Sequence, residues 1–212
     1  MSMNLAALIA AALIALPAAP EGDSPAPSLG KQLSDEHMAA YSDGGMARWQ
    51  AAMTPGRAHE FLREKFAGSW KLSAQANTGQ GMGPASEWTC EGTPMLGGRY
   101  VEMHASGTMH GMPMESITVL GYDNVRKLFH ATMYDTIGTG VHTLWGNLDE
   151  SGNVLTFVGP MDEPMTGEIG KSFMFTYTFN EDGSHDYLIS EILYGDPIPV
   201  VKAHAERVPE DG

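Results

Sequence analysis

From residue 68 onward the chain consists of short segments in which apolar and polar residues alternate with a period of two. Gly, Asn, Asp and Pro separate these segments. The alternation is typical of β-strands with one buried face, because successive side chains of a strand point to opposite sides. Phe173, Phe175 and Tyr177 show it most clearly. No segment of helical length interrupts the series, which excludes parallel strands joined by helical crossovers. We therefore expect an antiparallel, all-β domain.

We count ten such segments, and the connections between them alternate in length. Strands are expected at 70–77, 87–91, 99–106, 115–122, 127–134, 140–148, 153–158, 171–179, 185–192 and 199–208. Short turns are expected at 123–124, 149–152 and 180–183, and long loops at 79–86, 107–114, 135–139, 159–170 and 194–197. Successive hairpins of a meander lie at opposite ends of the sheet. These lengths predict an up-and-down barrel with one closed end and one open mouth, where a ligand would enter among the long loops.

The part of the chain before the strands divides into three predicted pieces. Residues 1–19 contain an apolar run from Leu5 to Leu16, which has the length of a signal peptide and is too short to span a bilayer. Residues 20–53 are interpreted as a linker and an N-terminal extension. The domain itself is expected at 54–210, beginning with a short helix that has Thr54 as its N-cap and Pro55 as its first residue. We expect a periplasmic or secreted protein with no membrane span in its mature form.

The charge of the chain argues against two classes of partner. Its 26 acidic and 12 basic residues give a formal net charge of −14. This charge repels the phosphates of nucleic acids and anionic membrane surfaces. The oligomeric state is left open. Cys90 is the only cysteine, so no disulfide can form within the chain.

The first expected strand opens with Gly68-Ser69-Trp70, and the last ends at Arg207. This opening resembles the G-x-W motif of lipocalins and fatty-acid-binding proteins, the calycin group. In that group the Trp packs across the closed end of the barrel beneath a basic residue of the last strand. The resemblance implies a lipocalin-like barrel in which the Arg207 guanidinium lies over the Trp70 ring.

Several longer motifs resemble a bacterial family known as domain of unknown function 1579. They are His59-Glu60-Phe61-Leu62 ahead of Gly68-Ser69-Trp70, Met95-Leu96-Gly97-Gly98-Arg99-Tyr100, Leu120-Gly121-Tyr122-Asp123, and Gly159-Pro160-Met161 followed by Gly170-Lys171. The resemblance covers the chain from about His59 to Val208. It implies the barrel fold and carries no activity with it.

The leading hypothesis for function is a protein that holds a small apolar or amphipathic molecule inside the barrel. The interior row of side chains is predicted to include Trp88, Val101, Met103, Phe129, Trp145, Phe173, Phe175 and Tyr177. A barrel packed solid with side chains is the other possibility that this pattern allows.

A second hypothesis is a copper site in a hairpin rich in Met and His. Residues 103–114 hold four Met and two His, and the candidate ligands are Met109, His110, Met112 and Met114. Thioether and imidazole groups suit Cu(I). The alternative is that these Met side chains form a flexible apolar lining around the mouth.

Haem is a third hypothesis, because nitrobindins, which are small ten-stranded barrels, hold haem through a His of a late strand. His204 has the corresponding position, but it shares its row with Lys202 and Glu206, which predicts that it faces outward. His130 and His142 are also assigned to outward rows. The chain has no hydrolase or phosphate-binding motif, and an enzyme of unrecognised type stays open. Cys90 is predicted to be a buried small hydrophobe.

Overall fold

The computed structural model describes residues 29–42, 44–164 and 166–209, which form two compact units with a boundary after Arg48. The first unit contains α2 (Leu29–Ser42) and the beginning of α3 (Gly45–Met53), so part of the segment expected as an extension is helical. The second unit holds the rest of α3, the helix α4 (Arg57–Phe66) and all the strands. The expected signal peptide lies outside the described residues.

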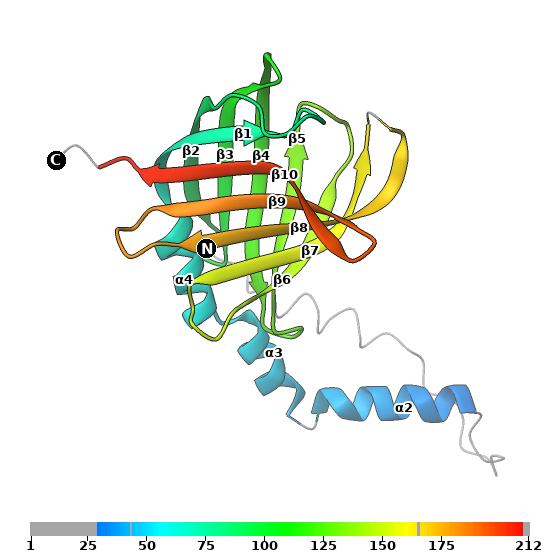
Figure 1. Ribbon diagram of the computed structural model, residues 1–212. Helices are drawn as coiled ribbons and strands as arrows, with labels where there is room; N and C mark the ends of the chain where they lie inside the picture. Colours follow the sequence, from blue (N-terminus) through cyan, green and yellow to red (C-terminus); the bar gives the residue numbers. More distant parts are fainter. Residues whose placement is uncertain (1–28, 43, 165, 210–212) are drawn as a thin grey trace, which may run out of the picture. The chain divides into compact units, whose positions relative to one another are not determined.

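Ten strands form a closed antiparallel barrel in which each strand pairs with its neighbours in the chain, and β1 pairs with β10 to close the circle (Figure 1). Their bounds are β1 Gly68–Ala76, β2 Ser86–Met95, β3 Tyr100–Met109, β4 Met112–Asp123, β5 Leu128–Asp135, β6 His142–Leu148, β7 Val154–Glu163, β8 Glu168–Phe179, β9 His185–Leu193 and β10 Asp196–Arg207. The ten-stranded up-and-down barrel preceded by a short helix, expected from the alternation, is therefore confirmed.

Two of the expected long loops are instead continuous hairpins. β3 and β4 pair as far as Met109 and Met112, which leaves a two-residue turn of His110 and Gly111 with φ of 50° and 79°. Positive φ at both central residues is the signature of a tight hairpin turn that follows the twist of its strands. β7 and β8 likewise pair as far as Glu163 and Glu168. The segments 107–114 and 159–170 are thus largely strand, and the barrel wall at this end is taller than expected.

Helix α4 begins at Arg57, two residues later than the expected start at Pro55. Gly56 precedes it, and the Gly56 backbone N–H donates to Nδ1 of His59, 3.1 Å away. One stripe of the helix is buried and consists of His59, Leu62 and Phe66. This stripe meets the barrel interior, because Leu62 and Phe66 belong to the same apolar core as strand residues such as Phe129 and Leu120.

The closed end of the barrel is the end at which β1 begins and β10 finishes, together with the turns β2–β3, β4–β5, β6–β7 and β8–β9. Trp70 is 2% exposed there, and its Nε1 donates to the Phe66 carbonyl oxygen at 3.1 Å. The Arg207 guanidinium lies 4.3 Å from the centre of the Trp70 ring. Its two terminal nitrogens donate to the carbonyl oxygens of Glu64 and Ala67, at the end of α4. The structure thus has the Trp and Arg arrangement that the calycin resemblance implies, and α4 is fastened beneath it.

Candidate binding site at the mouth of the barrel

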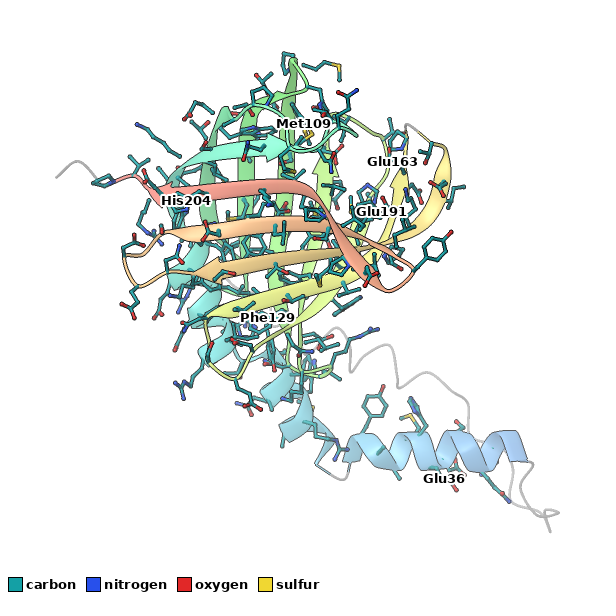
Figure 2. The ribbon with its side chains drawn as sticks, in the orientation of Figure 1. Glu36, Met109, Phe129, Glu163, Glu191 and His204 are labelled. Atoms are coloured by element: carbon teal, nitrogen blue, oxygen red, sulfur yellow. The ribbon has the colours of Figure 1, made fainter. Side chains whose placement is uncertain are left out.

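The mouth is the opposite end, formed by the hairpins β1–β2, β3–β4, β5–β6, β7–β8 and β9–β10. Figure 2 shows Met109 at this end and Phe129 toward the closed end. A pocket of about 350 Å³ lies at the mouth, between the start of β2 and the tip of the β3–β4 hairpin. Its lining is mainly small or apolar and includes Ala74, Ala76, Trp88, Met109 and Val201.

Trp88 is the largest side chain of this pocket. It is 8% exposed, and its Nε1 donates to Oγ of Ser86 at 3.0 Å. Its ring lies against Gly107 of β3, where an added Cβ would stand only 2.2 Å from a ring carbon. Only glycine leaves room for the indole at this position. The ring is therefore held between its hydrogen bond and the wall of the barrel, with part of its surface facing the pocket.

The predicted lining residues divide into two groups. Val101, Phe129, Phe173 and Phe175 do face inward, but they are closely packed members of the main core. Met103 and Tyr177 also face inward and are only partly buried. Trp88 alone among the eight lines the mouth pocket.

Trp145 does not belong to the interior. On β6 the buried residues are Leu144 and Gly146, so Trp145 stands on the opposite row. It packs on the outside against the His130 ring at 5.4 Å and beneath the Arg126 guanidinium at 4.5 Å. The prediction that Trp145 lines the interior is therefore wrong: the inward row of β6 consists of the even-numbered residues, one position away from Trp145. The same shift puts His142 on the inward row, contrary to expectation, whereas His130 faces outward as expected.

Inward-facing side chains become less buried from the closed end toward the mouth. On β9, His185 is buried, while Tyr187, Ile189 and Glu191 on the same row are only partly buried. Met103, Met133 and Met161 face inward and are also only partly buried. Accessible surface on an inward side chain means that a water-sized sphere can reach it. The inward side chains near the mouth therefore keep surface that water can reach, and much of that surface is flexible thioether.

An ion pair stands on the inward rows of β8 and β9 at the mouth. Nζ of Lys171 lies 2.8 Å from a carboxylate oxygen of Glu191 and 3.1 Å from one of Glu168. Hydrogen bonds to Glu191 and Glu168 raise the pKa of the Lys171 ammonium. With two carboxylates on one ammonium, this part of the rim is acidic.

Three polar rings lie lower in the barrel, on the same two strands. Tyr177 and Tyr187 are partners across the β8–β9 register and stack with their ring centres 4.6 Å apart. Burial raises the pKa of both phenols. His185 is 3% exposed, and its Nδ1 has no hydrogen-bond partner. Burial lowers the pKa of His185 to about 4, so its ring is neutral at pH 7.

The candidate copper ligands share one side of the β3–β4 hairpin. Met109 and Met112 are register partners at its tip, and Met114 follows on the same row opposite Gly107. His110 lines the mouth pocket from the turn. In the described part of the chain, no group of three or more His, Cys, Asp or Glu side chains could hold a metal ion, so a metal here would depend on thioethers.

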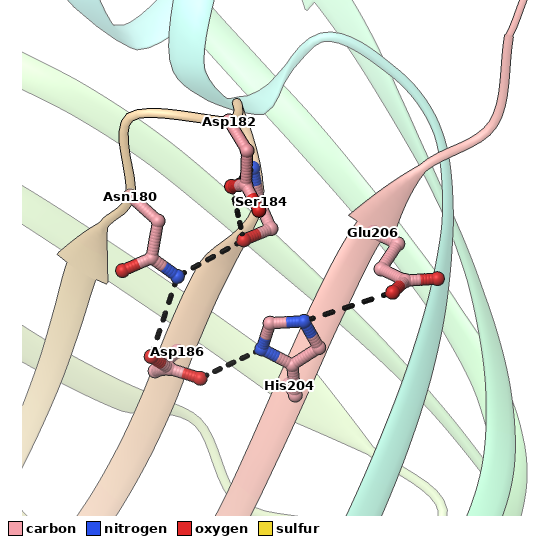
Figure 3. A network of polar contacts seen from close by, with 6 residues as sticks. All are labelled: Asn180, Asp182, Ser184, Asp186, His204 and Glu206. Carbon is pink, nitrogen blue, oxygen red and sulfur yellow. Dashed lines mark hydrogen bonds and ion pairs between the residues drawn. The ribbon is translucent and has the colours of Figure 1, made fainter.

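The outer face carries a polar network on β9, β10 and the turn before β9 (Figure 3). Nδ1 of His204 is 2.8 Å from a carboxylate oxygen of Asp186, and its Nε2 is 3.9 Å from one of Glu206. Asn180 also bonds Asp186, with its Nδ2 donating at 3.4 Å. His204 therefore lies on the outward row, as its neighbours in the sequence predicted, and does not project into the interior as a haem ligand would.

Cys90 is buried, as expected, beside Trp70. Burial raises the pKa of its thiol to about 12. The thiolate is the reactive form of cysteine, so this side chain acts as a small apolar residue.

The sequence analysis did not single out four residues of this candidate site: His185, Tyr187, Lys171 and Glu191. The alternation of the strands already places each of them on an inward row. The inward row of β8 extends from Phe173 back to Lys171, and β9 continues the same alternation from His185 through Ile189 to Glu191. Polar side chains on an inward row are exceptions to the apolar pattern, and such exceptions indicate a candidate binding site.

Comparison with known proteins gives a family and a fold. No curated protein matches the chain. Among solved structures, Rv2717c from M. tuberculosis is 14% identical, with a TM-score of 0.52, and the match covers 74% of this chain and all of that one. At this identity the likeness shows a shared fold alone. In the described part of the chain, no helix is long and apolar enough to cross a membrane. The family model for proteins of unknown function, DUF1579, matches residues 54–197, and the chain belongs to this family.

Proposed function

We propose that this protein binds a small apolar or amphipathic molecule, which enters at the mouth and lies in the upper part of the barrel. The observation that carries the proposal is the contrast along the inward rows. Side chains near α4 are fully buried, whereas Met103, Met133, Tyr187 and Ile189 keep accessible surface although they face inward. Apolar surface of this kind gains about 25 cal/mol per Å² when a ligand covers it.

The composition of the lining supports an adaptable site. Met side chains are unbranched and polarisable, so they fit ligands of different shape at little cost. The Trp88 ring adds a flat apolar wall that is already held in place by Ser86 and Gly107. A wall fixed in advance loses little entropy when a ligand binds.

The fluorescent probe N-phenyl-1-naphthylamine tests this proposal, because its emission rises in apolar surroundings. Ala74 faces inward and lines the pocket, so Ala74→Trp fills the mouth. We expect the variant to bind the probe at least about tenfold more weakly, which corresponds to roughly 1.4 kcal/mol. Ser73→Trp, one residue away on the outward row, should leave the affinity unchanged. Equal affinity in both variants and in the original chain would place the probe elsewhere and contradict the proposal.

Export is part of the proposal and rests on the apolar run from Leu5 to Leu16. A signal peptide would be removed before the barrel reaches its final compartment. Fractionation of cells followed by mass spectrometry of the mature chain tests it. We expect an exported form that lacks about the first nineteen residues. A full-length chain in the cytoplasmic fraction would contradict export.

A second candidate function is binding of Cu(I) at the tip of the β3–β4 hairpin. The observation that favours it is the placement of Met109, Met112 and Met114 on one row, where the first two are direct partners. Side chains of directly opposed residues start about 5 Å apart. Trp88, which leans on Gly107 of the same hairpin, could add a cation–π contact to a bound cation.

Competition with a chromogenic Cu(I) chelator tests this candidate. The double change Met109→Leu with Met112→Leu keeps the volume and removes two thioethers, so it should abolish copper uptake. Met174→Leu, on the outward row of β8, is the matched control and should bind as the original chain does. Unchanged uptake in the double variant would remove the copper hypothesis.

A further inference from the structure

The polar base of the interior is the set of three rings described above: Tyr177, Tyr187 and His185. It lies between the tightly packed closed end and the Met-lined upper interior. His185 contacts the Trp70 ring at 4.7 Å and the Tyr177 ring at 5.9 Å. Three hydrogen-bonding side chains among the apolar side chains at this level of the barrel cost free energy unless they find partners. Their available donors and acceptors therefore indicate what the site can recognise.

The tyrosine pair has at least one hydroxyl donor that no acceptor in the described part of the protein takes up. The two phenol rings are stacked against each other, and even a hydrogen bond between their hydroxyls would use only one of the two O–H donors. In the described residues no further hydrogen bond to either hydroxyl is found. The second O–H is free to donate to an oxygen atom of a ligand.

His185 adds an acceptor or donor of its own. Its Nδ1 is a buried polar atom without a partner, on a side chain that is only 3% exposed. An unpaired buried polar atom costs about 1–3 kcal/mol. A ligand hydroxyl at the tyrosine pair can both accept and donate. It would also satisfy the ring nitrogen below the pair where the side chains at this level move enough to open Nδ1, which a water-sized sphere does not reach.

The base offers no charge to pair with a charged ligand. In the part of the chain that the structure describes, no Lys or Arg acts on either phenol. Lys171 stands at the mouth and is already bound by Glu168 and Glu191. A carboxylate or ammonium buried here would lose its hydration without gaining an ion pair, which costs several kcal/mol.

Access reaches down to this level of the barrel. Tyr177 and Tyr187 are only partly buried, whereas Phe179 and His185, one step nearer the closed end on the same strands, are buried. Accessible surface on the inward rows of β8 and β9 therefore extends from the mouth as far as the tyrosine pair. A ligand that enters from the mouth would meet the pair with its leading end.

We propose that the polar base selects ligands with an uncharged, hydrogen-bonding head group, a hydroxyl or a carbonyl, and that their apolar tail extends toward Met103 and Met133. The preferred ligand class is thus a neutral amphiphile such as a long-chain alcohol or ketone, and carboxylate anions of the same length are rejected. This inference rests on the proposed binding function and adds the orientation and the chemistry of the ligand.

Displacement of N-phenyl-1-naphthylamine at pH 8 by decan-1-ol and by decanoate tests it. We expect the alcohol to displace the probe at a concentration at least about tenfold lower than the anion. In the double variant Tyr177→Phe with Tyr187→Phe, the alcohol should bind about five- to tenfold more weakly, because one neutral hydrogen bond is worth roughly 1 kcal/mol. Tyr100→Phe removes a hydroxyl from the outward row of β3 and should change nothing.

The possible results separate this inference from the proposed function. If the probe binds but the anion displaces it as well as the alcohol does, the head-group inference fails and the binding function stands. If the probe binds and the double variant, shown to be folded by circular dichroism, keeps the full preference for the alcohol, the role of the tyrosine pair is wrong. If the probe does not bind the original chain at all, both proposals fall. The single change Tyr187→Phe gives the same readout should the double variant not fold.

Discussion

The same ten strands build two very different ends. At the closed end, α4 inserts Phe66 among aromatic rings, and Trp70 and Arg207 seal the base, so that side chains are almost fully buried. At the mouth, inward residues are Met, Ala and an ion pair, and they remain partly accessible. The difference teaches that strand pairing alone does not decide where a barrel is solid. The inserted helix fills one end, and inward side chains at the other end keep accessible surface.

The largest expected effect comes from emptying the closed end. Phe66 is fully buried, so Phe66→Ala should lower the free energy of unfolding by about 3–5 kcal/mol. Met109→Ala at the mouth removes a partly buried side chain and should cost less than about 1 kcal/mol. Urea denaturation of both variants measures the contrast. Similar losses at the two positions would mean that the two ends are packed alike.

We expect acid to destabilise the folded chain through His185, near the closed end. Burial holds its pKa at about 4 in the folded chain, below its ordinary value of 6.5. The unfolded chain therefore binds a proton at a pH where the folded chain does not, and stability falls as the pH drops from about 6.5 toward 4. Above that window this contribution is fully present. The total loss is roughly 3 kcal/mol, at about 1.4 kcal/mol for each pH unit.

The change His185→Leu should flatten this part of the pH profile of unfolding. His104 is exposed on the outward row of β3, so His104→Gln is the control and should keep the slope. A profile that is unchanged in His185→Leu would show that another group causes the acid sensitivity.

Two Arg side chains lie over Trp rings, one at the closed end and one on the outer surface of the barrel. Their contributions to stability can therefore be compared directly. Arg207 lies over the buried Trp70 and also bonds two carbonyl oxygens of α4 and its C-terminal flank. We expect Arg207→Ala to cost about 2 kcal/mol. Arg126 lies over Trp145 on the outer surface, and Arg126→Ala should cost about 0.5 kcal/mol. Equal losses of unfolding free energy in the two variants, measured by thermal or urea denaturation, would show that Arg207 stabilises the closed end no more than Arg126 stabilises the outer surface.

The smallest effect on stability is expected for the ion pair at the mouth. Lys171→Met breaks contacts with Glu168 and Glu191 at a rim that water reaches, so the free energy of unfolding should change by less than about 1 kcal/mol. Unfolding measured at low and high salt checks this value. A loss as large as that of Arg207→Ala would show that the mouth is held together by charge.

The alternation of residues was enough to predict the barrel and its strand number. It failed at Trp145, where the largest side chain was taken to face inward. The structure places Gly146 inward instead, because β7 leaves no room for a side chain: an added Cβ would stand 2.1 Å from the Thr156 carbonyl oxygen and 2.9 Å from a Phe157 ring carbon. This close approach of the neighbouring strand cannot be foreseen from the β6 sequence alone.

The mouth shows a second limit of sequence reasoning. Glycine is a frequent turn residue, so Gly107 suggested the start of a loop. In the structure Gly107 is a strand residue that makes room for the Trp88 ring. The polar base was missed for a related reason, since Tyr177 and Tyr187 become a pair only through the register of β8 and β9. Such features depend on contacts between strands, which a single strand's pattern does not contain.

Methyl NMR of the protein labelled at its Met methyl groups, titrated with decan-1-ol, tests the central claim most directly. The account predicts that the methyl signals of the inward Met103, Met109, Met133 and Met161 shift together and saturate. The signal of Met174, on the outward row of β8, should stay in place. Shifts confined to Met38, Met46 and Met53 of the exposed helical segments, or no saturable shift at all, would contradict a binding site inside the mouth of the barrel.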